Sequence, residues 1–294
     1  MGETHHESEF EKLICAHLHD NGWEHSNHGT DKGYDVERAL YPPDLFAWLE
    51  ETQPEQWAKI VKPADSPAVQ DKAKINLLDR VVKVLNTPLN AGGGTLNLLR
   101  RGFSTGAAKF KMAEFKPATT LNPDATARYQ AMRLRVMQQV RYSTKHGNSI
   151  DLVLFVNGLP VATIELKTDN TQSIEHAIQQ YKKDRKPAGE PLLGFANRCL
   201  VHFAVSNTRV AMTTKLDGDN TFFLPFDMGD NGAAGNPIVA GKSPTAYLWE
   251  RVLQRDAWLH IIGKMMHLEH SESTDPITGE VTKNSMLLFP RFHQ

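Results

Sequence analysis

One short stretch of the chain combines two acidic residues and a lysine in a pattern that suits phosphodiester chemistry. Asp151 opens an apolar, β-branched run, and Glu165 and Lys167 lie near the end of a second such run. Two carboxylates are suitable ligands for Mg²⁺, which usually keeps several of its waters. A bound divalent metal lowers the pKa of water, and a nearby ammonium group stabilises charge on a phosphoryl oxygen. These side chains therefore predict metal-dependent phosphodiester hydrolysis, provided that they meet.

A predicted β-hairpin must position these three residues. Asn157-Gly158 is a strong turn signal, and it separates residues 150–156 from residues 161–167, which both have strand character. Glu165 and Lys167 share one face of their strand because side chains alternate along a strand. The hairpin therefore brings the acidic start of one strand close to the acidic and basic end of the next.

The register of this hairpin decides whether the two carboxylates share a face. A plain two-residue turn would pair Asp151 with Ile164, and Asp151 and Glu165 would then lie on opposite faces. An odd loop or a single β-bulge restores them to one face. Pro160, which lacks an N–H, favours irregular pairing beside the turn.

The acidic-x-lysine spacing is not specific by itself. The chain contains three such tripeptides, namely Glu114-Phe-Lys116, Glu165-Leu-Lys167 and Asp184-Arg-Lys186. Only the second lies in a strand that a turn signal joins to another strand beginning with an aspartate. The alternative is that Glu165 and Lys167 form a surface ion pair, which would contribute little stability.

Composition sets the class of protein. The 294 residues are 40% hydrophobic and 23% charged, as in ordinary globular proteins, and this length allows one large domain or one domain with appendages. Two cysteines, Cys15 and Cys199, are too few for a disulfide framework or a cysteine-based zinc site. The sequence has no apolar run long enough for a membrane span and no secretory signal. We therefore expect a cytoplasmic protein.

Charge is unevenly distributed along the chain. The formal net charge is −1, yet residues 100–146 contain ten basic residues and two acidic ones. A local basic segment in a neutral chain is typical of a polyanion-binding surface, and the alternative is an ordinary solvated face. The candidate DNA contacts are Arg128, Arg133, Arg135, Arg141 and Lys145.

The expected elements give an α/β fold with a mixed central sheet flanked by helices. Helices are predicted over residues 7–20, 42–58, 67–86, 124–138, 172–183 and 244–267. Strands are predicted over 109–115, 150–156, 161–167, 199–205 and 209–213, a long loop over 217–243, and a polar linker over 268–285.

The stretch from Asn148 to Lys167 resembles the nuclease motif of the restriction (R, HsdR-type) subunits of type I restriction–modification enzymes. These subunits belong to the PD-(D/E)xK superfamily. Further similarity to that family lies in Phe10-Glu11, Gly22-Trp23, Thr52 to Trp57, Arg101-Gly102-Phe103, Asn122-Pro123 and Trp249 to Leu253. The resemblance therefore covers nearly the whole chain and implies a restriction-endonuclease-like core.

The resemblance also implies roles for individual residues. Asp151 and Glu165 would bind Mg²⁺, Lys167 would be the catalytic lysine, and Glu11 would support the site from the first helix; the alternative for Glu11 is helix capping. Some relatives carry Gln-x-x-x-Tyr on the helix after the lysine. Here the full pattern is absent, since Asp184 follows Gln180 at that spacing, so only Gln180 is carried over.

Finally, the resemblance implies a domain organisation. Residues 1–267 would form the nuclease domain, with a core at about 100–215, and residues 268–294 would be a linker and the start of a helicase-like ATPase. Gln294 resembles that motor's adenine-contacting glutamine, so the longer protein would bind ATP and translocate DNA. The implied partners are duplex DNA and the methylation and specificity subunits. Two alternatives remain: a non-catalytic DNA-binding or assembly module of nuclease fold, and a free-standing repair or junction nuclease.

Overall fold

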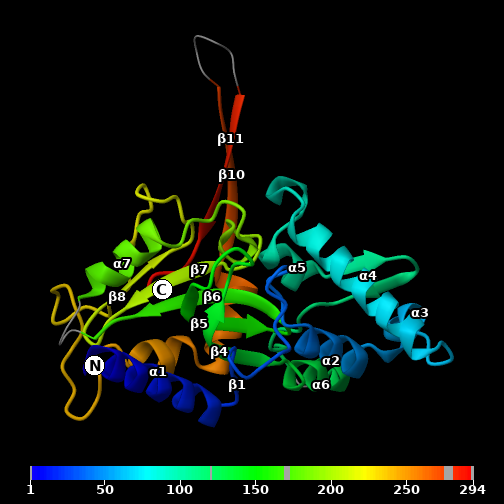
Figure 1. The fold of residues 1–294 in the computed structure, drawn as a ribbon, viewed down its shortest axis with the longest axis horizontal. Coiled ribbons are helices and arrows are strands. Elements are labelled where there is room, and N and C mark those ends of the chain that lie inside the picture. The colour runs from blue at the N-terminus through cyan, green and yellow to red at the C-terminus, as the bar shows by residue number, and fades with distance from the viewer. Residues whose placement is uncertain (1, 120, 169–172, 275–280, 293–294) are drawn as a thin grey trace.

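A central mixed sheet dominates the computed structural model, which describes residues 2–119, 121–168, 173–274 and 281–292 (Figure 1). Its strands lie in the spatial order β1 (Glu24–Asn27), β4 (Leu134–Arg141), β5 (Ser149–Val156), β6 (Leu159–Leu166), β7 (Val201–Val205), β8 (Val210–Thr213) and β9 (Leu224–Pro225). The β1–β4 and β6–β7 pairs are parallel, and the other neighbours are antiparallel. The expected α/β fold with a mixed sheet flanked by helices is confirmed.

Helices cover both faces of the sheet and extend one end of it. The α-helices are α1 (Gly2–Asp20), α2 (Pro42–Thr52), α3 (Pro54–Ile60), α4 (Pro67–Leu85), α5 (Thr95–Arg101), α6 (Pro123–Gln130), α7 (Ile174–Lys183) and α8 (Arg255–His260). Shorter helical turns are η1 (Leu89–Ala91), η2 (Pro191–Leu193), η3 (Leu248–Val252) and η4 (Ile261–Met265). Two antiparallel hairpins lie outside the central sheet: β2 (Phe103–Thr105) with β3 (Ala108–Phe110), and β10 (His267–Thr274) with β11 (Val281–Leu288). None of the described helices has the length and apolar character that a membrane span requires.

Strands β5 and β6 form the centre of the core because both of their faces are covered. Leu152 and Ile164 pack in the same apolar cluster as α1, whereas Val153 and Phe155 pack in a second cluster with α7. All residues of β6 are buried. Such nearly continuous apolar runs are typical of strands that lie between two helical layers. The hairpin that carries the acidic residues is therefore rigidly held.

The sequence interpretation is wrong at β4, which was expected to continue the helix over residues 124–138. Helix α6 ends at Gln130, and residues 134–141 form a strand between β1 and β5. The strand has no clean alternation because it is also covered on both sides: Val136 joins one core cluster, and Met137 joins the other. Apolar residues at such mixed spacing also fit a helix, which explains the error.

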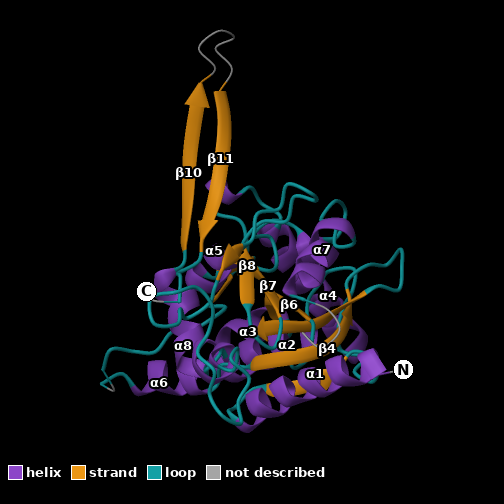
Figure 2. Ribbon diagram, turned by 90° about the vertical axis from the view of Figure 1, so that its left-hand side faces the viewer, coloured by secondary structure: helices purple, strands orange, loops and turns teal. Residues whose placement is uncertain are grey.

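Two further expectations are corrected. Residues 268–274 and 281–285 of the expected polar linker belong to the β10–β11 hairpin, which projects from the body of the molecule (Figure 2). Beyond its base, where Leu268 and Leu287 pack on the core, its described side chains are mostly exposed, so the strands lack the apolar alternation that identifies a strand. The single helix expected over 244–267 is divided into η3, α8 and η4, and the helix expected over 42–58 is divided at Pro54, which cannot donate a backbone hydrogen bond.

Candidate active site

The β5–β6 hairpin contains the irregularity on which the shared face depends. Val156 pairs with Leu159 and Phe155 with Pro160, but the register then shifts, and Leu152 pairs with Ile164. One extra residue on β6 thus forms a β-bulge beside the turn. Continuing this register places Asp151 opposite Glu165, on the same face of the sheet. The expectation that a bulge brings the two residues together is confirmed.

Asp151 lies at the open end of the hairpin. Its Oδ2 accepts a hydrogen bond of 2.7 Å from the backbone N–H of Leu166, and its Oδ1 lies 3.5 Å from Nε2 of Gln139. The bond from Leu166 fixes the carboxylate beside the last residues of β6. The side chain is only partly buried, so water or a ligand can reach it.

Glu165 is completely buried and is held by an arginine. Arg185, just beyond α7, donates from Nε to Oε1 of Glu165 at 2.6 Å and from Nη2 to the carbonyl of Ser149 at 2.8 Å. No donor among the described residues reaches Oε2 of Glu165. Burial and the neighbouring charge of Asp151 raise the pKa of Glu165 well above its usual value, although Arg185 opposes this shift. The carboxylate therefore presents one neutralised oxygen and one unsatisfied oxygen.

Lys167 follows β6 and contacts the N-terminal helix. Its Nζ lies 3.4 Å from Oε1 of Glu7 on α1, and its side chain is only 12% exposed. Glu165 and Lys167 therefore do not form the surface ion pair considered as the alternative, because each has a different partner. The ammonium group remains at the edge of a small cavity that Gln180 also lines.

Gln139 connects the acidic residues of this region. It lies across from Asp151 between the pairs Gln138–Leu152 and Val140–Ile150, and its φ of +51° is unusual for a non-glycine residue in a strand. Its Nε2 donates to Oε2 of Glu11 at 3.1 Å, and its Oε1 accepts from Oγ of Ser149 at 2.9 Å. Strained backbone of this kind persists only where the surroundings enforce it, and it is frequent at functional sites.

Glu11 reaches the site from α1. Its side chain is 8% exposed, Oε1 has no hydrogen-bond partner among the described residues, and burial raises its pKa to about 7. The nearby charge of Asp151 also raises the pKa of Glu11, whereas Gln139 lowers it. The carboxylate faces the hairpin across Gln139, which disfavours the alternative role of helix capping.

Gln180 and Tyr181 on α7 have different environments. Oε1 of Gln180 is buried without a hydrogen-bond partner among the described residues, and the residue lines a cavity with Lys167. The hydroxyl of Tyr181 lies 2.7 Å from Oγ1 of Thr163 and 3.2 Å from the carbonyl of Phe203. Tyr181 is therefore part of the packing between α7 and the sheet, and only Gln180 faces the region of Lys167.

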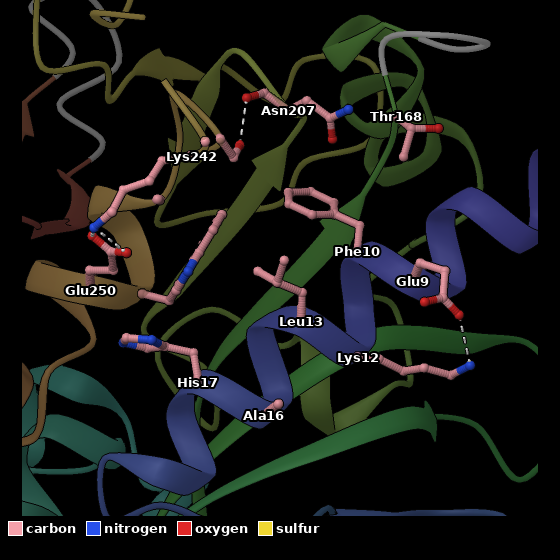
Figure 3. A pocket seen from close by; sticks show the side chains of 14 residues that line it. Glu9, Phe10, Lys12, Leu13, Ala16, His17, Thr168, Asn207, Lys242 and Glu250 are labelled. Atoms are coloured by element: carbon pink, nitrogen blue, oxygen red, sulfur yellow. Dashed lines mark hydrogen bonds and ion pairs between the residues drawn. The ribbon is translucent and has the colours of Figure 1, made fainter. Parts of the chain in front are cut away.

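A polar cavity of about 380 Å³ lies beside the carboxylates of Asp151 and Glu11. Its walls include Glu11, Gln139, Asp151 and Leu166. A larger cavity of about 950 Å³ lies between α1 and the segment of η3, and its lining is mainly apolar (Figure 3). The charged groups of that larger cavity are already paired, as Lys12 with Glu9 and Lys242 with Glu250. The smaller cavity is therefore the better candidate for polar chemistry.

The carboxylates of Asp151, which lines this cavity, and of the buried Glu165 suit a hard cation. Asp151 and Glu165 offer carboxylate oxygens, and the unsatisfied Oε2 of Glu165 has an unmet need for a positive partner. Among the described residues, no group of three or more His, Cys, Asp and Glu side chains is arranged to hold a metal ion. Two carboxylates with waters completing the shell fit the coordination habit of Mg²⁺ rather than that of a closed protein cage.

The basic segment does not form one free surface. Arg128 pairs with Glu114, Arg133 with Glu51 and Arg135 with Asp44, at N–O distances of 2.7, 2.8 and 2.7 Å. The Arg135–Asp44 pair is nearly buried, with side chains 11% and 6% exposed, and Arg135 also stacks over Tyr41. Arg135 therefore belongs to the packed interior and not to a free basic surface.

The remaining candidate DNA contacts, Lys145 and Arg141, are exposed. Lys145 is 64% exposed and lies 3.7 Å from Glu190. Arg141, at the end of β4, is exposed and lines a cavity next to Gln139. Gln294, the candidate nucleotide contact, lies outside the described residues.

Sequence reasoning missed three residues of this site, namely Glu7, Gln139 and Arg185. The first could have been found from its helical spacing to Glu11. Neither of the other two has a local signal: Gln139 belongs to the strand that was read as a helix, and Arg185 follows the end of α7. Their importance arises only from tertiary contacts.

The comparisons with known proteins place this geometry in context. Residues 5–221 match the family model described as "Type I restriction enzyme R protein N terminus". No curated protein matches the sequence. The matched range includes every residue that surrounds the two carboxylates.

Proposed function

Because the chain belongs to the family of type I restriction enzyme R protein N-terminal regions, we propose that it is a Mg²⁺-dependent endonuclease domain that cuts duplex DNA. The observation that carries this proposal is the bulged hairpin, which places Asp151 and Glu165 on one face with one carboxylate oxygen unsatisfied. A core packed only for stability would not leave a buried carboxylate oxygen without a donor.

In this proposal, Asp151 and Glu165 hold the cation. When bound, Mg²⁺ would supply an activated water and would offset charge on the phosphoryl oxygens. Arg185 holds Oε1 of Glu165 and leaves Oε2 directed to the site, while the N–H of Leu166 fixes Asp151. These contacts orient both carboxylates before the substrate arrives, so little reorganisation is needed in the reaction.

Lys167 supplies the positive charge that the reaction needs beside the carboxylates. In the free protein its ammonium group pairs with Glu7 at 3.4 Å, and its side chain is largely buried. A phosphate group carries its negative charge on several oxygens and can accept from an ammonium as Glu7 does, so DNA would compete with Glu7. We propose that Lys167 then orients the attacking water or stabilises the developing charge on phosphorus oxygens.

The substitution Asp151→Asn tests the proposal. Asparagine keeps an oxygen for the N–H of Leu166 but loses the negative charge, so cleavage of plasmid DNA with Mg²⁺ should fall by more than about 100-fold. Folding and DNA binding should be retained, as measured by thermal unfolding and by binding without metal. Asp71→Asn on the exposed surface of α4 is the matched control and should cleave normally.

The outcome also separates the alternatives. Normal cleavage by Asp151→Asn would remove Asp151 from the site. A wild-type chain that binds duplex DNA but does not cut it with Mg²⁺ would instead indicate a non-catalytic DNA-binding or assembly module. Lys167→Ala should abolish cleavage while metal binding persists, because a charged lysine cannot be a metal ligand.

For the protein as a whole, we propose that cleavage is coupled to ATP-driven DNA translocation and that the partners are the methylation and specificity subunits. The family description supports this assembly, since it names an R protein of a type I restriction enzyme. Translocation and ATP hydrolysis by the full enzyme should survive Asp151→Asn. Their loss together with cleavage would point to a structural role for the hairpin.

A further inference from the structure

A second polar cavity adjoins the carboxylate cavity. Its volume is about 430 Å³, and it lies where β1 leads into the following loop, at the end of β4 and the start of β5. Asn27 and Gln139 line both cavities. Gln139 also contacts Asp151, so a group bound in the second cavity would lie next to the carboxylates.

Two cations without acidic partners converge on this cavity. Lys32 and Arg141 line it, and among the described residues neither forms an ion pair with a carboxylate. The Nζ of Lys32 reaches only the carbonyl of Gly29, at 3.5 Å. Burial and the charges of Arg141 and Lys32 lower the pKa of His28, whereas Asp31 raises it, so the ring favours its neutral form.

One carboxylate also lines the cavity, but its bonding capacity is in use. Oδ1 of Asp31 accepts from the N–H of Gly33, and Oδ2 accepts from the hydroxyl of Tyr41, both at 2.8 Å. Counting Asp31 against Lys32 and Arg141, the lining carries one net positive charge. That charge suits one phosphodiester group.

Tyr34 and His28 also line the cavity, but their polar atoms lie behind its surface. The hydroxyl of Tyr34 and Nδ1 of His28 are buried and have no hydrogen-bond partner among the described residues. Burial keeps both atoms from direct contact with a group in the cavity, so Lys32 and Arg141 are the donors that an anion would meet there.

We propose that this cavity, lined by Lys32, Arg141, Tyr34 and His28, binds a phosphate group of the DNA backbone next to the phosphate that is cut. The inference rests on the proposed nuclease function, because the neighbouring carboxylates identify the polymer to which the phosphate belongs. The cavity gives the cleavage site a fixed point on the strand without reading any base.

The salt dependence of DNA binding tests this site. The variant Lys32→Gln/Arg141→Gln and the control Lys62→Gln/Lys72→Gln each remove two exposed charges, the control on the side of α4. Binding of a labelled DNA duplex is measured by fluorescence anisotropy in EDTA over a range of salt concentrations. The slope of log K against log salt should fall by about 1 in the cavity variant, the value for one phosphate contact, and should be unchanged in the control.

Equal slopes for the wild type and the cavity variant would overturn the proposal. Thermal unfolding of each variant establishes that it is folded.

Two further arms separate the sources of phosphate and the two proposals. Calorimetry at constant ionic strength measures the binding of inorganic phosphate to the wild type and to the cavity variant. If the variant loses phosphate binding but its slope of log K for DNA against log salt is unchanged, the ligand is free phosphate. That result would overturn the assignment of the cavity to DNA. Because the anisotropy is measured without metal, an inactive protein with the expected slope change would refute the nuclease and support the cavity. An active nuclease with unchanged slopes would do the reverse.

Discussion

Folding arranges charged side chains differently at the carboxylate end of the β5–β6 hairpin and in the basic segment of residues 100–146. In the hairpin, two acidic residues that are separated in the sequence come onto one face of the sheet, and one buried carboxylate oxygen stays unsatisfied. In the basic segment, neighbouring cations separate and find acidic partners, as Arg133 does with Glu51 and Arg135 with Asp44. Charge density along a sequence is therefore a weaker guide to a binding surface than charges whose partners are missing after folding.

The largest expected effect on stability within this comparison concerns Arg185. Arg185→Met would leave the buried Glu165 without its only basic partner among the described residues, which typically costs about 3–5 kcal/mol. Thermal or denaturant unfolding measures this loss at pH 8, a pH at which a solvent-exposed glutamate is ionised. Arg185→Met/Glu165→Gln should recover most of it, because no buried charge is left unpaired.

A wild-type stability for Arg185→Met alone would contradict the importance of this pair. The variant Arg185→Lys is the matched control for charge. Lysine keeps a cation beside Glu165. It lacks the planar guanidinium group with which Arg185 donates to both Glu165 and the carbonyl of Ser149. We therefore expect a stability between those of the wild type and Arg185→Met.

The next effect distinguishes the two kinds of cation in the basic segment. Arg135→Gln should destabilise the protein by about 3 kcal/mol, because Asp44 would stay buried without its partner, and should leave the salt dependence of DNA binding unchanged. Lys145→Gln should do the opposite, since it is 64% exposed: stability is retained and the salt slope falls by up to about 1. Equal changes in stability and in salt slope for the two variants would contradict the distinction between internal and surface cations.

The smallest effect is a dependence of stability on pH through Glu11. Its pKa is raised from 4.5 to about 7, so in this range the folded protein binds a proton that the unfolded chain has released. The free energy of unfolding therefore decreases as the pH rises through this range, by about 2 kcal/mol between pH 5.5 and pH 8 for this group. Glu11→Gln should remove that component and should be more stable than the wild type at pH 8.

Denaturant unfolding in EDTA at the two pH values measures this difference. The absence of metal matters because a bound cation would favour the ionised carboxylate. The same pH dependence in Glu11→Gln as in the wild type would show that other groups cause it.

The sequence contained the catalytic candidates but not their surroundings. The turn at Asn157-Gly158 and the apolar, β-branched runs on either side of it predict the hairpin, and the parity of its numbering shows that an odd loop or a bulge is needed to place Asp151 and Glu165 on one face. Helix α7 and strands β7 and β8 also follow from local patterns. These elements have strong local signals and short connections.

The missing parts depend on tertiary structure. Strand β4 is buried on both sides, so its pattern resembles that of a helix, and this error hid Gln139 at the centre of the site. Arg185 reaches Glu165 only because α7 returns across the sheet, which no local pattern encodes. The β10–β11 hairpin was missed for the opposite reason, since its strands are exposed and polar.

The bulge in β6 also restricts how the length of this hairpin can change. Deleting one residue, such as Val161, would remove the bulge and leave an uninterrupted ladder in which Asp151 still lies opposite Glu165. Inserting one residue between the turn and the glutamate, with the bulge kept, would instead turn the two carboxylates to opposite sides of the sheet. The bulge can therefore absorb a single deletion but not a single insertion, so a change that looks minor in an alignment can separate the acidic pair while leaving the fold in place.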